Sequence, residues 1–140
     1  MPRRPRSLTL AHNRTFDAMP GFDRRWRELG LTEADQIRLM WEIMADPEGA
    51  GKVILGAGSI RKLRFGDPDD NRGERGAYRV WYVHVPDLSV VVLVTVYDKA
   101  DEPDLSQADK KALTAAVDRV VAARRANEAA ARTRQTKRRR

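Results

Sequence analysis

The sequence AYRVWYVHVPDLSVVVLVTVY, residues 77–97, decides the fold, because it holds two β-strands and the turn that joins them. Residues 77–85 are rich in β-branched and aromatic side chains, which favour strands. Residues 86–89 contain proline, aspartate and serine, as turns do. Residues 90–97 are almost continuously apolar, which is typical of a strand buried on both faces. We therefore expect this second strand at the centre of a sheet.

A third strand is expected just before this pair, at IRKLRF, residues 60–65. Side chains alternate between the two faces of a strand, so Leu63 and Phe65 share one face while Lys62 and Arg64 share the other. The polar, glycine-rich segment 66–76 reads as the turn that leads to the next strand. These segments predict a small antiparallel sheet of three to four strands.

Two short helices are expected before the sheet, joined tightly as an N-terminal hairpin. Phe22, Trp26 and Leu29 have the spacing of one helical face, and a glycine follows them. Thr32 opens the second helix, with Asp35 completing an approximate capping box. The apolar face expected for this second helix comprises Ile37, Met40, Trp41 and Met44.

A final helix is expected after the sheet, opened by Ser106 with Asp109. Its apolar stripe comprises Leu113, Val117, Val120 and Val121. The fold class is therefore α+β. We expect a basic, loosely ordered arm over residues 1–14, one domain over 15–123, and a basic tail over 124–140 where the helix frays into disorder.

Composition narrows the class of protein. A chain of 140 residues is the size of one domain. It has no cysteine, hence no disulfide and no thiolate metal site, and its longest apolar run is too short to cross a bilayer. We expect a soluble, cytoplasmic protein that does not bind membranes. The net charge of +7 is concentrated at the ends, where it either solvates a tail or adds affinity for a polyanion such as RNA.

Basic side chains from three strands are candidates for one anion-binding patch. Lys62 and Arg64 share the face opposite the expected core, Arg79 lies in the neighbouring strand, and Lys99 directly follows the last strand. Clustered cations repel one another, so an anionic partner such as a phosphodiester favours the arrangement. RNA cleavage needs charge stabilisation of this kind around the phosphorus. The alternative is that these residues form only the solvated face of a half-exposed sheet.

Five segments occur in an order that resembles a known family. They are FDRRWRELGLT (22–32), DPEGAG (46–51), GAGSIRKLRF (56–65), GAYRVWY (76–82) and VYDKADEPDLS (96–106). With the final helix, they are similar to the RelE/HigB-type toxins of bacterial type II toxin–antitoxin systems. The resemblance implies an α+β fold with a basic active face. It also implies a metal-independent endoribonuclease that needs no cofactor and cuts mRNA on the ribosome.

The resemblance assigns roles to the basic residues. Lys62 matches a strand cation of the family and is expected to act as base or charge stabiliser. Arg79 matches the arginine after the glycine-containing turn and is assigned to phosphate stabilisation. Lys99 matches the basic residue past the last strand and is assigned to the leaving-oxygen side or to 30S rRNA contact. Candidate substrate-binding residues are Arg61, Arg64, Arg75, Tyr82 and Tyr97.

The chain also departs from the family. Some relatives have a C-terminal Tyr or His that acts on the nucleotide, whereas Leu105 stands where such a residue is sought. Tyr82 or Tyr97 then either stacks a base or packs in the sheet, and His84 is either catalytic or a packing residue.

Partners follow from the family as well. We expect a cognate antitoxin, of the kind that carries a helix-turn-helix domain, together with mRNA and the 30S ribosome. Two other classes of function remain open. One is a ParE-like toxin that binds gyrase without cutting RNA. The other is an inactive relative that only binds RNA or antitoxin.

Overall fold

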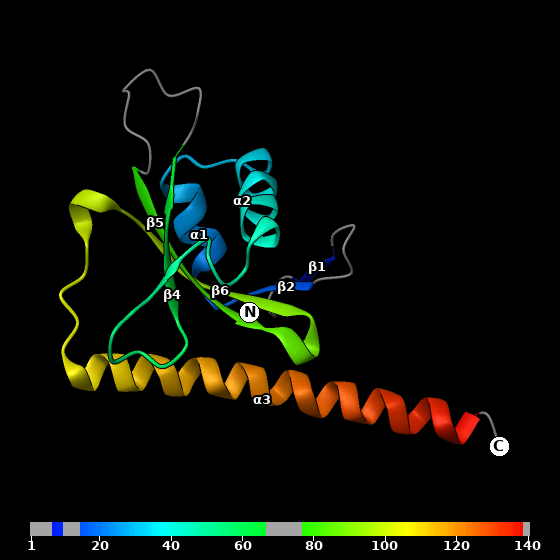
Figure 1. Cartoon of the computed structure of the whole chain (residues 1–140). Helices are drawn as coiled ribbons and strands as arrows, with labels where there is room; N and C mark the ends of the chain where they lie inside the picture. Colours follow the sequence, from blue (N-terminus) through cyan, green and yellow to red (C-terminus); the bar gives the residue numbers. More distant parts are fainter. Residues whose placement is uncertain (1–6, 10–14, 67–76, 139–140) are drawn as a thin grey trace.

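The computed structural model describes residues 7–9, 15–66 and 77–138, and its centre is a twisted sheet (Figure 1). Six strands stand in the order β1-β2-β6-β5-β4-β3. Their bounds are β1 Ser7–Thr9, β2 Thr15–Ala18, β3 Lys52–Val53, β4 Arg61–Phe65, β5 Tyr78–Val85 and β6 Val90–Asp98. The expected antiparallel meander is therefore confirmed as β4, β5 and β6.

β6 lies between β5 and β2, so the central position expected for the apolar strand is confirmed. The expected sheet of three to four antiparallel strands is wrong in two respects. The sheet has six strands. It is also mixed, because β2 pairs with β6 in parallel. β2 has only four residues, and it pairs with a strand more than 70 residues further along the chain. A pairing this distant leaves no local pattern in the sequence.

Two helices, α1 (Phe22–Glu28) and α2 (Glu33–Ala45), pack on one face of the sheet (Figure 1). They do not form an N-terminal hairpin, because β1 and β2 precede them. The predicted capping box of α2 is confirmed, since Thr32 Oγ1 accepts from Asp35 N at 3.1 Å and Asp35 Oδ2 accepts from Thr32 N at 2.8 Å. Trp26 Nε1 donates to Thr32 O at 2.8 Å and ties α1 to this cap.

The core beneath these helices is aromatic on the side of α1. Trp26 lies between Phe22 and Phe65, with ring centroids at 5.8 and 5.6 Å. On α2 the predicted apolar face is partly wrong, because Ile37 and Trp41 are 47% and 44% exposed. The buried residues of α2 are Gln36, Leu39, Met40, Ile43 and Met44. The buried face of α2 is rotated relative to the predicted one, because it includes Gln36, whose amide donates to Asp23 of α1. A prediction from hydrophobic periodicity does not count a glutamine as buried.

The last helix, α3 (Gln107–Arg138), runs along the opposite face of the sheet (Figure 1). Its predicted cap is confirmed by hydrogen bonds from Asp109 N to Ser106 Oγ at 3.1 Å and from Ser106 N to Asp109 Oδ2 at 3.2 Å. Val117 is buried in a second cluster with Trp81, and the rest of the predicted stripe packs against this cluster. The sheet thus separates two apolar clusters, one under each helical layer.

The predicted fraying after residue 123 is not observed, because α3 continues to Arg138. Arg124 Nε lies 3.4 Å from an oxygen of Asp17, a buried residue of β2. Arg125 pairs with Asp87 in the short 3-10 helix η1, Pro86–Leu88. These ion pairs fix the helix where the tail was expected to begin, and the alanine-rich sequence beyond favours helix. Among the described residues, no helix is long and apolar enough to cross a membrane.

Candidate phosphate-binding face of the sheet

Two rows of side chains cross three strands on the sheet face opposite α1 and α2, along which α3 also runs. We call the part of this face around Arg64, which is exposed, and Lys62, which is partly exposed, the open face. In the first row, Arg64 of β4 is paired with Arg79 of β5, which is paired with Tyr97 of β6. In the second row, Lys62 is paired with Trp81, which is paired with Thr95. The alternate residues of these strands pack in the core beneath α1 and α2. The strand alternation thus places three of the predicted cations together.

A glutamate connects these rows. Lys62 Nζ donates to Glu102 Oε1 at 2.5 Å, and the hydroxyl of Tyr97 donates to the same oxygen at 3.2 Å. Trp81 Nε1 donates to the Tyr97 hydroxyl at 2.9 Å and completes a chain of three hydrogen bonds. Glu102 lies between the 3-10 helix η2 (Lys99–Asp101) and α3, so a loop outside the sheet supplies the carboxylate.

The electrostatics of this cluster favour an ionised glutamate. The hydrogen bond from Lys62 lowers the pKa of Glu102, and the charges of Lys62 and Arg79 act in the same direction. Burial raises the pKa of Tyr97 to about 12, so its hydroxyl remains a donor at neutral pH. The side chains of Lys62 and Glu102 are 36% and 49% exposed. The ion pair of Lys62 and Glu102 is therefore partly open to solvent.

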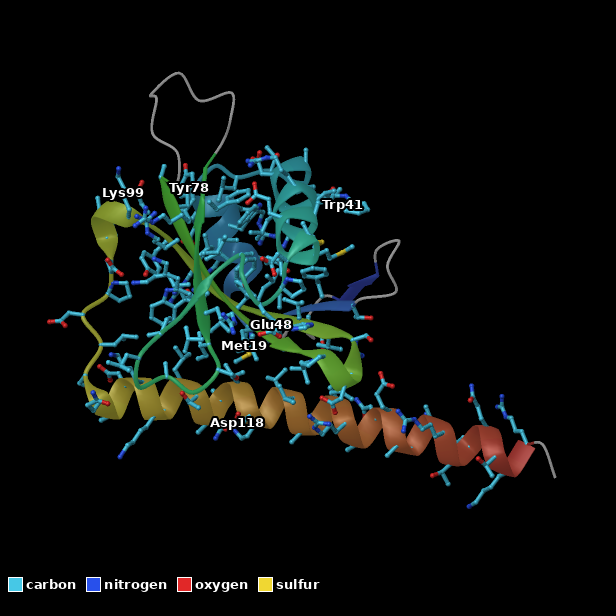
Figure 2. All side chains as sticks on the ribbon, in the orientation of Figure 1. Met19, Trp41, Glu48, Tyr78, Lys99 and Asp118 are labelled. Atoms are coloured by element: carbon cyan, nitrogen blue, oxygen red, sulfur yellow. The ribbon has the colours of Figure 1, made fainter. Side chains whose placement is uncertain are left out.

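Lys99 stands apart from the two rows. It is the first residue of η2, and its backbone N–H donates to Ala77 O at 2.9 Å. Its side chain is exposed at the end of the sheet near Tyr78, the end away from α3 (Figure 2). Of the other predicted substrate-binding residues, Arg64 is exposed, Tyr97 is buried, and Arg75 lies outside the described residues.

Arg61 points to the other face of β4, away from Lys62. Its guanidinium donates to the backbone oxygens of Glu48 and Gly51 at 2.5 and 3.1 Å, and to the Glu48 carboxylate at 2.9 Å. The same carboxylate lies 2.6 Å from His84 Nδ1. The structure therefore assigns Arg61 to holding the loop after α2, and the expected contact of Arg61 with substrate finds no support.

Tyr82 is fully buried, which favours the packing alternative over stacking on a base. Its hydroxyl donates to Pro47 O at 2.8 Å and accepts from Gly51 N at 2.9 Å. A Cβ on Gly51 would lie 2.8 Å from the Tyr82 ring, which explains the glycine at this close approach. Tyr82 and Arg61 thus hold the same loop from neighbouring strands.

Sequence reasoning missed Glu102 and Trp81 as members of this face. Glu102 follows β6 by four residues, within the segment 96–106, but nothing local indicates that it folds back onto β4. No protein-family model matches the sequence. Among the described residues, no group of three or more His, Cys, Asp or Glu side chains is placed to hold a metal ion. What the face offers chemically is positive charge, one ionised carboxylate and hydroxyl donors.

Proposed function

We propose that this protein is a toxin of the RelE/HigB type, a metal-independent endoribonuclease that cleaves mRNA on the ribosome and stops translation. The observation that carries the proposal is the grouping of Lys62, Arg64 and Arg79 on one open face of the sheet. A phosphodiester is the anion that suits such a group, because arginine forks match its non-bridging oxygens. The ordered family-like segments give the proposal its second support.

The phosphate is expected to bind where the Glu102 carboxylate now meets Lys62. The carboxylate comes from a loop, and an exposed ion pair of this kind is worth only about 1 kcal/mol or less. A phosphate carried by an RNA strand, with Arg79 and Arg64 beside it, can compete for the same lysine. Lys62 and Arg79 would then stabilise the added negative charge of the phosphorane.

Glu102 is our candidate for the general base. Lys62 donates a hydrogen bond in the structure, so we assign it to charge stabilisation. In the proposed step the 2′-hydroxyl gives its proton to Glu102 and the 2′-oxygen forms a bond to phosphorus. The bond from phosphorus to the 5′-oxygen breaks, and that oxygen takes a proton from water, since Lys99 lies apart from the two rows. The products are a 2′,3′-cyclic phosphate and a free 5′-hydroxyl.

We extend the proposal to partners. An antitoxin with a helix-turn-helix domain would hold the toxin inactive in the cytoplasm by covering the basic face, and mRNA on the 30S ribosome would be the target. The cations on the open face disfavour a gyrase poison, since binding to gyrase requires no site for a single phosphodiester.

The test maps mRNA 5′ ends shortly after induction of the protein in bacteria. The wild type and the control Arg24→Ala, which changes an exposed cation of α1, should produce new 5′ ends within coding sequences. Arg79→Ala should produce none. Full activity of the variant, or no new ends with the wild type, would refute the proposal. Pulse labelling separates the rivals, because a ribonuclease stops translation first and a gyrase poison stops DNA synthesis first.

A further inference from the structure

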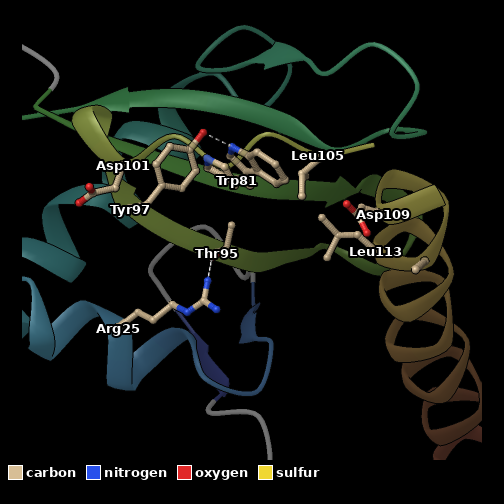
Figure 3. Close-up of a pocket in the computed structure, with 10 residues that line it drawn as sticks. Arg25, Trp81, Thr95, Tyr97, Asp101, Leu105, Asp109 and Leu113 are labelled. Carbon is tan, nitrogen blue, oxygen red and sulfur yellow. Dashed lines mark hydrogen bonds between the residues drawn. The ribbon is translucent and has the colours of Figure 1, made fainter. Parts of the chain in front are cut away.

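A cavity of about 490 Å³ adjoins the proposed phosphate site (Figure 3). It is enclosed by the paired strands β5 and β6 on one side and by the loop after η2 and the first turns of α3 on the other. Its volume is within the range of small-ligand sites. Its wall on the sheet is formed by Trp81, Thr95 and Tyr97. Leu105 and Leu113 close it from the loop and from α3. The cavity is therefore mostly apolar, with two large rings on one side.

The two aromatic rings are held in place by each other. The indole of Trp81 and the ring of Tyr97 meet edge to face, with centroids at 5.8 Å, and the hydrogen bond between them fixes both. The two side chains are largely buried, at 4% and 9% exposure, so a base can meet them only at the floor of the cavity. Aromatic rings at such a position favour the stacking of any base in single-stranded RNA.

Three charged groups line this cavity: Arg25 of α1, Asp101 of η2 and Asp109 of α3. Arg25 of α1 donates to Thr95 Oγ1 at 2.7 Å, and its guanidinium approaches the cavity from the side of α1 (Figure 3). Asp109 on the first turn of α3 uses one oxygen to cap the helix through Ser106 N. Its carboxylate can also accept from the exocyclic amino group of a base. Adenine, guanine and cytosine carry such an amino group, whereas uracil does not.

Tyr97 connects the cavity with the phosphate site. Its ring lines the cavity, and its hydroxyl donates to Glu102, the partner of Lys62. A nucleotide whose phosphate lies at Lys62 thus has an aromatic cavity beside it for a base. Resting on the proposed function, we propose that this cavity binds the base next to the scissile phosphate and prefers a base with an amino group.

The test uses 2′-O-methyl dinucleotides, which cannot be cleaved because the attacking hydroxyl is blocked. Calorimetry should show ApA, GpG and CpC binding about tenfold more tightly than UpU, the scale of one charge-assisted hydrogen bond. Ala112 is exposed on α3 and lines the cavity, so Ala112→Phe should fill it without disturbing the core. This variant should lose about tenfold in affinity for the amino-bearing dinucleotides. Ala122→Phe, an exposed change further along the same helix, should bind like the wild type.

Equal binding of the four dinucleotides, or unchanged binding by Ala112→Phe, would overturn the proposal. If Ala112→Phe weakened only the complex with an antitoxin, the cavity would be a peptide site and the proposal would also fail. The proposed function is judged separately by Arg79→Ala. If cleavage depended on Arg79 but not on the cavity, the proposed ribonuclease activity would stand and the proposed base pocket would be refuted. If the dinucleotides bound but no RNA was cleaved, the base pocket would stand and the ribonuclease activity would be refuted.

Discussion

Arg61 and Lys62 are neighbours on β4, yet they occupy opposite faces of the sheet and have different surroundings. Arg61 meets two backbone oxygens and a carboxylate on the face of α2, and its side chain is 20% exposed. Lys62 meets one carboxylate from a loop and is nearly twice as exposed. The comparison teaches that positive charge alone does not mark a functional residue. The face of the strand decides whether the charge serves the fold or is open to a ligand.

The largest effect is expected from the open face. Lys62→Ala and Arg79→Ala should each slow RNA cleavage by about 100-fold or more, the scale of losing one preorganised charge at a reacting centre. Lys62→Ala should not change the free energy of unfolding by more than about 1 kcal/mol, since the Lys62 pair is exposed. Cleavage rates on programmed ribosomes, with urea unfolding as control, test both statements. If these variants lost activity only because they were unfolded, the residues of the open face would serve stability, as Arg61 does, and the two faces would not differ.

Glu102→Gln sharpens the comparison on the same face. Cleavage should fall by about 100-fold if the carboxylate is the general base. Binding of uncleavable RNA should become a few times tighter, because an ionised carboxylate no longer competes with phosphate for Lys62. Cleavage rate and affinity, measured on one preparation, should thus move in opposite directions. If both fell together, Glu102 would only position Lys62.

Arg61→Ala examines the other face. It removes hydrogen bonds to Glu48 and to the oxygen of Gly51, so we expect a loss of about 1–3 kcal/mol in the free energy of unfolding. Cleavage per folded molecule should stay within about twofold of the wild type at a temperature where the variant is folded. Urea titration gives the first quantity, and the folded fraction corrects the second. If Arg61→Ala were stable but inactive, substrate would bind on the face of Arg61, and our assignment of substrate to the face of Lys62 would be wrong.

The smallest effect is expected from pH. A hydrogen bond with His84 lowers the pKa of Glu48, and one with Lys62 lowers the pKa of Glu102, both from an ordinary value of 4.5. A lowered folded pKa adds stability that is complete above the unfolded value and is lost as pH falls through the folded value. The urea midpoint should therefore change little from pH 8 to about 6 and fall below about 4.5. Glu102→Gln should remove part of that fall, and an unchanged profile in this variant would contradict the ion pair.

Much of the fold could be predicted because its signals are local. The three strands of the meander follow from residue type and alternation, and both capping boxes follow from the spacing of hydroxyl and carboxylate side chains. The parallel strand β2 could not be predicted, since its partner lies far along the chain. Neither could the helix beyond residue 123, which ion pairs with Asp17 and Asp87 hold in place.

The candidate site was predictable only where alternation decides direction. Alternation placed Lys62 and Arg64 on one face, and the register of β4 with β5 in the structure adds Arg79 to it. It gave no indication that Glu102 returns to Lys62, because loop closure depends on tertiary packing. It also did not show that the loop after α2 covers the other face and occupies Arg61 and Tyr82 with hydrogen bonds. Which face of a sheet stays open is a property of the whole fold.

The most direct test asks which face of the sheet binds RNA, with two indole N–H signals as reporters. The indole of Trp81 donates to Tyr97 on the open face, and that of Trp26 donates to Thr32 under the helices. An uncleavable 2′-O-methyl RNA should be titrated into ¹⁵N-labelled protein and followed by NMR. We predict that the Trp81 indole signal shifts while that of Trp26 stays in place. A shift of Trp26 alone, or of neither signal at saturating RNA, would contradict the assignment of the open face to RNA.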